Sequence, residues 1–211
     1  MSGWSHWTEL RTGIPHEETA PPLPNDNEIE GWFNYQSAYR EAAQRFGTQT
    51  RPVLVEVGCW AGASTIFLAA HLPTTARLYA VDTWLGSYNQ PDLIQKARDH
   101  DIYHQFLRYC AHYHVLDRVV PIRLPSTTAA QLFDDRSCDF VYIDACHAYD
   151  AVMADLIAWT PKVKPGGVIA GHDYNCDTHK EVTKAVHDYF PASAIQVRSG
   201  GVVWWVEVHG E

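Results

Sequence analysis

The sequence has few cysteines, and none of them forms a recognisable metal-binding or disulfide pair. Its five cysteines are odd in number and include no C-x-x-C motif, which argues against a zinc ribbon or a disulfide framework. No apolar run approaches the roughly 20 residues that cross a bilayer. The N-terminus lacks the basic start and apolar core of a signal peptide. We therefore expect a cytoplasmic protein with reduced thiols and no membrane partner.

Basic residues are also scarce compared with acidic ones. The chain has 25 Asp and Glu against 16 Lys and Arg, for a net charge of −9. Nucleic-acid binding needs a basic surface that neutralises phosphates, so we expect no nucleic-acid partner. At 211 residues the chain is long enough for one domain with a substantial core. The proline-rich residues 1–30 are predicted to form an N-terminal arm or lid, with Trp4 and Trp7 as anchors, and residues 31–211 a single domain.

A β-branched run at residues 53–57 leads into a turn and then into helical spacing from Ala63. The turn has glycine at Gly58 and Gly62, but a dinucleotide fold would need another where Trp60 stands. Glu56 precedes the first glycine by two residues. This Glu-x-Gly-x-x-x-Gly pattern resembles motif I of class I S-adenosylmethionine-dependent methyltransferases, and a purely structural turn is the alternative. The resemblance implies that the turn contacts S-adenosylmethionine through Glu56, Gly58, Cys59, Trp60, Gly62 and Ser64.

A second acid, Asp82, ends the predicted buried strand 77–82. Its distance from Gly58 is near the roughly 20 residues that place an acid against a ribose diol, and a turn or helix-capping acid is the alternative. The following Asp-x-Trp-x-Gly stretch resembles small-molecule methyltransferases, which implies cofactor contacts from Thr83 and Trp84. On weaker grounds Ser126 resembles a position that flanks the adenine.

Strands and helices alternate along the rest of the chain. Amphipathic helices are predicted at 28–46 and, as one long helix, at 92–115, and Pro121 indicates an edge position for the strand at 119–124. Residues 194–198 and 202–208 read as a terminal hairpin. We therefore predict an α/β, Rossmann-like class I methyltransferase fold: a seven-stranded, mostly parallel sheet with a C-terminal antiparallel hairpin and helices on both faces.

Four more polar residues follow the fourth and fifth predicted strands: Asp144, His147, His172 and Asp173. The carboxyl ends of parallel strands converge on one crevice, so these side chains are expected to meet. Asp144, His172 and Asp173 could share a divalent ion, with Mg²⁺ or Mn²⁺ suited to carboxylates and the histidine admitting a softer metal. His147 is the leading candidate for a general base, and a structural histidine is the alternative. His172 is a ligand or a second candidate base.

Residues 139–149 and 164–174 resemble the later motifs of small-molecule O-methyltransferases, most closely the cephalosporin-hydroxylase and macrocin-type branch. In those relatives an acid after the fourth strand and an acidic pair after the fifth hold a metal, and Asp144 and Asp173 match two of these positions. Asp144 would then also lie against the cofactor. His172 replaces an acid and Tyr174 replaces an Asn of the catechol enzymes, which leaves open the presence and identity of the metal.

The resulting hypothesis is methyl transfer from S-adenosylmethionine to a hydroxyl of a small molecule such as a sugar, polyketide or phenol. A divalent metal, a metal-free histidine base, or neither could assist the reaction. Two alternatives remain: a metal-dependent hydrolase or hydroxylase-like enzyme on the same scaffold, and a non-catalytic cofactor-binding protein. Relatives are often oligomeric, so a homo-oligomer is expected.

Overall fold

The computed structural model describes residues 28–210. The proposed arm at residues 1–30, with Trp4 and Trp7, therefore lies almost wholly outside the described residues. From Glu28 to Gly210, no helix has the length and apolar character needed to cross a bilayer.

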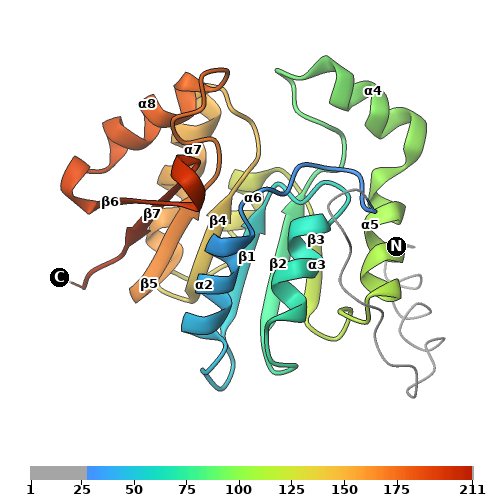
Figure 1. Ribbon diagram of the computed structural model, residues 1–211, viewed down its shortest axis with the longest axis horizontal. Coiled ribbons are helices and arrows are strands. Elements are labelled where there is room, and N and C mark those ends of the chain that lie inside the picture. The colour runs from blue at the N-terminus through green and yellow to red at the C-terminus, as the bar shows by residue number, and fades with distance from the viewer. Residues whose placement is uncertain (1–27, 211) are drawn as a thin grey trace.

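Within the described part of the chain, one twisted sheet of seven strands forms the centre of the fold (Figure 1). The strand order is β3-β2-β1-β4-β5-β7-β6, and β7 runs antiparallel to both of its neighbours while the other pairs are parallel. The predicted fold class is thereby confirmed, and so is the edge position of the proline-containing strand β3. The strands are β1 (Val53–Val57), β2 (Arg77–Asp82), β3 (Val119–Arg123), β4 (Cys138–Ile143), β5 (Val163–Gly171), β6 (Ile195–Arg198) and β7 (Val203–Glu207).

Helices cover both faces of the sheet, as Figure 1 shows. Successive strand residues point to opposite faces. In β1, Leu54 belongs to the core cluster under α2, α3 and α5, whereas Val55 belongs to the cluster under α6, α7 and α8. The bounds are α2 (Gln36–Phe46), α3 (Ala63–Ala70), α5 (Ile102–His112), α6 (Ser126–Ala130), α7 (Tyr149–Trp159) and α8 (Lys180–Tyr189). Short 3₁₀ turns at Thr160–Lys162, Ala192–Ala194 and Ser199–Gly201 lie in the connections.

The helix predicted at 28–46 begins only at Gln36. The preceding segment turns at Gly31, where φ is +150°, and Trp32 is 67% exposed instead of packing on the sheet. Tyr35 is buried at the N-terminal boundary of α2 and directs its side chain toward the ends of the strands. The prediction was therefore wrong for the first eight residues. Five of them line one wall of a cavity instead: Glu30, Gly31, Trp32, Asn34 and Tyr35.

The single helix predicted at 92–115 is two helices, α4 (Pro91–His100) and α5. Asp101 separates them with a left-handed φ of +42°, and its carboxylate accepts a hydrogen bond from the backbone N–H of His104 at 3.5 Å. Asp101 thus ends one helix and caps the next. The spacing of apolar residues continues through Asp101, so the sequence pattern does not indicate the boundary between the two helices. α4, all of which is described, has no buried residue and stands away from the sheet (Figure 1).

Candidate active site

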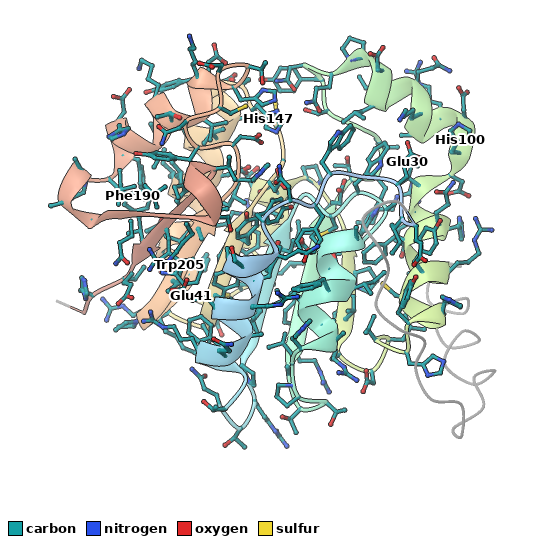
Figure 2. The ribbon with its side chains drawn as sticks, in the orientation of Figure 1. Glu30, Glu41, His100, His147, Phe190 and Trp205 are labelled. Atoms are coloured by element: carbon teal, nitrogen blue, oxygen red, sulfur yellow. The ribbon has the colours of Figure 1, made fainter. Side chains whose placement is uncertain are left out.

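A cavity of about 790 Å³ opens at the carboxyl ends of β1, β2, β4 and β5. His147 lies at this end of the molecule, and Glu30 lies across from it beside α4 (Figure 2). The cavity brings together most of the residues that the sequence singles out: Gly58, Cys59, Trp60, Gly62, Ser64, Asp82, Thr83, Ser126, Asp144, His147, His172 and Asp173. Glu56 and Trp84 are not part of its lining.

The glycine turn lets the end of β1 lie directly against the end of β4. Gly58 has a φ of +90°, and a Cβ placed there would lie 1.9 Å from the carbonyl oxygen of Asp144. Gly62 has a φ of +97°, and its Cβ would lie 2.8 Å from the Phe106 ring. Only glycine combines this backbone conformation with such close approach. Gly58 therefore lets the turn lie against the Asp144 backbone, and Gly62 lets it lie against the Phe106 ring.

Glu56 lies beneath the turn and is fully buried. It accepts hydrogen bonds from the hydroxyls of Tyr39, at 2.7 Å, and Thr65. Burial raises the pKa of Glu56, although these hydrogen bonds oppose that shift. Glu56 thus joins the turn to α2 and α3. The sequence predicts that Glu56 contacts the cofactor. The structure instead buries Glu56 beneath the turn, outside the cavity lining, where it supports the turn.

Asp82 organises the same turn from the end of β2. Its Oδ2 accepts from the backbone N–H groups of Cys59 and Trp60, both at 2.9 Å, and its Oδ1 accepts from that of Trp84 at 2.7 Å. These bonds hold Trp60 in a left-handed conformation with a φ of +44°. A carboxylate has about four acceptor positions, so about one remains for a ligand hydroxyl. Asp82 therefore acts as a turn acid, the alternative to a ribose contact in the sequence analysis, and it also lines the cavity, where the predicted ribose contact stays a prediction.

Trp84 is buried behind the turn, and its indole N–H donates to the Trp60 carbonyl at 2.7 Å. It therefore supports the cavity wall rather than lining it, contrary to the prediction from its sequence position.

Ser126 does line the cavity, where its hydroxyl accepts a hydrogen bond from the Trp159 indole N–H at 2.8 Å. Beside it lies Asp155, which sequence analysis did not single out for the site. Burial raises the pKa of Asp155 to about 6, against an opposing hydrogen bond from Ser126.

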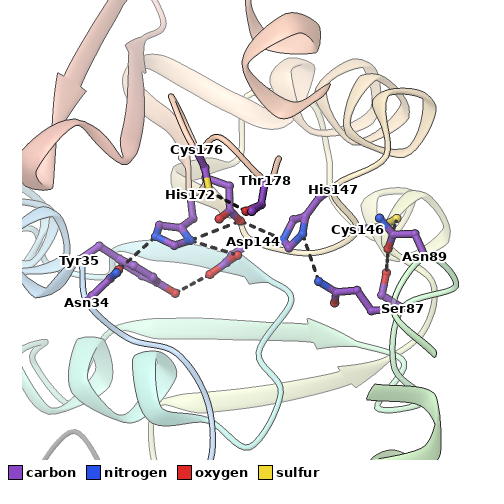
Figure 3. Close-up of polar contacts among 12 residues, drawn as sticks. Asn34, Tyr35, Ser87, Asn89, Asp144, Cys146, His147, His172, Cys176 and Thr178 are labelled. Atoms are coloured by element: carbon purple, nitrogen blue, oxygen red, sulfur yellow. Dashed lines mark hydrogen bonds and ion pairs between the residues drawn. The ribbon is translucent and has the colours of Figure 1, made fainter. Parts of the chain in front are cut away.

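The four polar residues after β4 and β5, namely Asp144, His147, His172 and Asp173, form one network; Figure 3 labels the first three. Asp173 Oδ2 lies 2.9 Å from His147 Nε2 and 3.4 Å from His172 Nδ1, and Asp144 Oδ1 lies 3.8 Å from that same His172 nitrogen. The outer contacts come from distant segments. The Tyr35 hydroxyl donates to Asp144 Oδ2 at 2.6 Å, Asn34 Oδ1 lies 3.2 Å from His172 Nε2, and Gln90 Nε2 lies 3.3 Å from His147 Nδ1.

The network shifts the titration of its members. Burial would lower the pKa of both histidines, but hydrogen bonds to Asp173 and the nearby carboxylate charges outweigh it and raise the pKa of His147 and of His172. Burial likewise opposes ionisation of Asp173, yet its two histidine partners hold the pKa of Asp173 well below its usual range. Burial raises the pKa of Asp144, against the charge of His172.

Two groups of side chains in the described chain have the spacing to hold a metal ion. One is the predicted set, Asp144, His172 and Asp173. The other combines His147 and Asp173 with His179, whose ring centroid lies 4.0 Å from that of His147. Asn34, Tyr35 and Gln90 were also absent from the predicted site. Their contacts join segments 57 to 138 residues apart, and no local pattern in the sequence signals them.

Comparisons with known proteins identify the family and the fold of the chain. The methyltransferase domain family model matches residues 55–174 of the chain, more than half of its length. The uncharacterized protein y4gI of Sinorhizobium fredii is 32% identical over 101 residues, which are 48% of this chain and 10% of that protein. The chain thus spans only a small part of the curated relative that it matches.

Solved methyltransferases share the fold at low sequence identity. The O-methyltransferase NovP matches with a TM-score of 0.67 and 17% identity over 83% of this chain and 79% of its own. An S-adenosylmethionine-dependent O-methyltransferase from Thermotoga maritima matches with a TM-score of 0.60 and 12% identity, over 90% of this chain and 73% of its own. The Bacillus cereus O-methyltransferase in complex with SAH matches with a TM-score of 0.51 and 16% identity, over 96% of this chain and 90% of its own. With its glycine turn, sheet order and matched family model, the chain belongs to the methyltransferase domain family and has the class I S-adenosylmethionine-dependent methyltransferase fold.

Proposed function

We propose that this protein transfers the methyl group of S-adenosylmethionine to a hydroxyl of a small molecule. The observation that carries the proposal is that one cavity joins the glycine turn and Asp82 to the Asp144–His147–His172–Asp173 network. Its volume of about 790 Å³ lies in the range of small-molecule sites, about 300–1,000 Å³. The turn and Asp82 would hold the cofactor, and the network would face the acceptor.

His147 is suited to the proton transfer that this reaction needs. With its Nε2–H donated to Asp173, the imidazole keeps a lone pair on Nδ1, and the Gln90 amide lies at that nitrogen. An acceptor hydroxyl that replaces Gln90 there would give its proton to Nδ1. The oxygen of the acceptor hydroxyl forms a bond to the methyl carbon of S-adenosylmethionine as the sulfur–methyl bond breaks. The electrons of the broken bond stay on sulfur, which leaves S-adenosylhomocysteine. Because the reaction is a direct displacement, positioning contributes a large part of the rate.

Asp144, His172 and Asp173 fit a divalent ion. Ligands of one ion at about 2.1 Å lie about 3–4 Å apart, and the His172 nitrogen is already 3.4 and 3.8 Å from the two carboxylate oxygens. With its Nε2–H donated to Asn34 Oδ1, His172 would offer Nδ1 to a metal. The Tyr35 hydroxyl binds Asp144 Oδ2, and Asp144 Oδ1 faces His172 Nδ1, where an ion would lie. A bound ion would supply positive charge that lowers the pKa of an acceptor hydroxyl.

The lining of the cavity supports a neutral or cationic acceptor. Among residues 28–210 the lining has five carboxylates, those of Glu30, Asp82, Asp144, Asp155 and Asp173, and neither Lys nor Arg. A phosphorylated acceptor would meet like charge there. Trp32 and Tyr88 line the same cavity and are 67% and 63% exposed, so they offer ring faces to a sugar or a phenol. Assembly into a homo-oligomer and a cytoplasmic location stay predictions.

A thermal-shift series tests the proposal. S-adenosylhomocysteine should raise the melting temperature as the logarithm of its concentration, because it binds the native state. Mn²⁺ or Mg²⁺ should add a further increase that a chelator reverses and that Asp173→Ala abolishes. No increase with S-adenosylhomocysteine at millimolar concentration would contradict the proposed function, and an unchanged metal response in Asp173→Ala would contradict the metal assignment.

A further inference from the structure

His147, Asp173 and His179 form a group of possible ligands beyond the proposed Asp144–His172–Asp173 set. They come from three connections: the loop after β4, the end of β5 and the residue before α8. Each places a ligand atom within 4.8 Å of the others. His147 Nε2 and Asp173 Oδ2 are already 2.9 Å apart, and the two imidazole rings are in contact, with centroids 4.0 Å apart.

We propose that these three side chains bind a zinc ion and that its binding removes His147 from catalysis. Two imidazoles and one carboxylate, with a fourth position left open, form a typical zinc ligand set, whereas Mg²⁺ prefers oxygen ligands in an octahedron. Ligand atoms around a tetrahedral zinc lie about 3.4 Å apart. The His147–Asp173 pair, at 2.9 Å, would open by about 0.5 Å, and a pair as far apart as 4.8 Å would close by about 1.4 Å. The His179 side chain is only partly buried and can supply this movement.

The contacts of His147 explain why bound zinc would inhibit the proposed methyl transfer. Zinc bound at Nε2 leaves the single proton of the imidazole on Nδ1, at the nitrogen that faces Gln90. If the Gln90 amide turns over, its oxygen accepts a hydrogen bond from that N–H, as carboxylate and carbonyl oxygens commonly do for the other ring N–H of zinc-bound histidines. His147 then has no lone pair to accept the proton of an acceptor hydroxyl. Zinc also takes an oxygen of Asp173, which the other metal group shares.

The binding site itself does not depend on the proposed methyl transfer, whereas the inhibition rests on it. The two can therefore be measured separately. Equilibrium dialysis of the full chain against Zn²⁺, in excess Mg²⁺, should give a site that Mg²⁺ does not displace. His179→Ala should weaken Zn²⁺ binding about tenfold or more, because it removes a direct ligand and even the loss of a ligand's hydrogen-bond partner weakens metal binding about 10–100-fold.

Two variants serve as controls. His100→Ala removes an exposed imidazole at the far end of α4 from His147 (Figure 2), and Cys176→Ser removes a thiol that also lines the cavity. Both should bind Zn²⁺ like the wild type. The Co²⁺-loaded protein should show the intense visible bands of four-coordinate cobalt and no thiolate charge-transfer band, and His179→Ala should lose those bands.

Equal Zn²⁺ affinity in the wild type and His179→Ala would overturn the site, as would loss of binding in Cys176→Ser. Zinc binding that depends on His179, in a protein that binds no S-adenosylhomocysteine, would uphold the site and reject the proposed function. Where methyl transfer is observed, Zn²⁺ should inhibit the wild type, and His179→Ala should need about tenfold more Zn²⁺ for the same inhibition. Equal sensitivity of the two proteins would reject the inhibitory role.

Discussion

The hydroxyl of Tyr35 donates to Asp144 Oδ2 at 2.6 Å and connects the start of α2 with the end of β4 across 109 residues of sequence. The phenol is buried and lies against the His172 ring, with ring centroids 4.3 Å apart. Tyr35 thus fixes one oxygen of a proposed metal ligand and one face of another. Such outer contacts orient ligands and commonly contribute 10–100-fold to metal affinity.

Tyr35→Phe should therefore weaken Mn²⁺ binding about tenfold, because Asp144 loses the donor that orients it. Titration with Mn²⁺, with the free ion followed by electron paramagnetic resonance, measures the change. Tyr113→Phe is the matched control, since its hydroxyl donates to Glu28 at 3.3 Å, outside the cavity. Equal Mn²⁺ affinity in the two variants would show that Tyr35 does not support a metal ligand.

The His147–Asp173 pair should make stability depend on pH in the metal-free protein. The pKa of His147 is raised in the folded state. Its contribution is therefore fully present below the unfolded pKa of about 6.5 and is lost as pH rises through the folded pKa. The pKa of Asp173 is far below this range, so Asp173 stays ionised throughout.

Urea unfolding of the wild type and His147→Gln in chelator, at pH 6 and pH 9, tests this linkage. The excess stability of the wild type over His147→Gln should be larger at pH 6 than at pH 9. An excess that is constant, or that grows toward pH 9, would mean that Asp173 does not favour the charged imidazole.

Glu56 should be important for stability rather than for contact with a ligand. Glu56→Ala leaves the buried hydroxyls of Tyr39 and Thr65 without their acceptor and opens a void, which should lower the free energy of unfolding by about 3–5 kcal/mol. Glu56→Gln keeps one acceptor oxygen and should lose less. Urea unfolding followed by tryptophan fluorescence gives both values. A Glu56→Ala protein as stable as the wild type would refute the supporting role.

Gly58 can be compared with Gly166, which also has a positive φ. Gly166→Ala, at a φ of +80° with open space around its Cβ, should cost only the left-handed backbone, about 1–2 kcal/mol. Gly58→Ala meets the Asp144 carbonyl as well, so it should lose more stability and also weaken S-adenosylhomocysteine binding. Unfolding and calorimetric titration separate the two effects. Similar losses in both variants would show that close packing at Gly58 is unimportant.

The sequence predicts the sheet well because each strand and turn has a local pattern. The β-branched run before Gly58 and the acids after β2 and β4 are read directly from neighbouring residues, and Pro121 places β3 at the edge. Helix boundaries are less predictable. The apolar spacing continues through Asp101, where one residue in a left-handed conformation divides α4 from α5.

The site is predicted only where residues follow strands. The ends of parallel strands converge, which is enough to bring Asp144 and Asp173 together. Asn34, Tyr35 and Gln90 reach the network from segments whose paths depend on tertiary packing, so their side chains could not be placed in advance. Glu56 shows the opposite error. Its place in a cofactor motif suggests a ligand contact, but Glu56 is fully buried and binds the hydroxyls of Tyr39 and Thr65.

Calorimetric titration of the wild type and Asp82→Ala with S-adenosylhomocysteine tests the central claim most directly, with NAD as the control ligand. We expect saturable binding of one S-adenosylhomocysteine per chain, weaker binding in Asp82→Ala because the turn loses three hydrogen bonds, and no binding of NAD. Absence of S-adenosylhomocysteine binding at millimolar concentration, or preferential binding of NAD, would contradict the account.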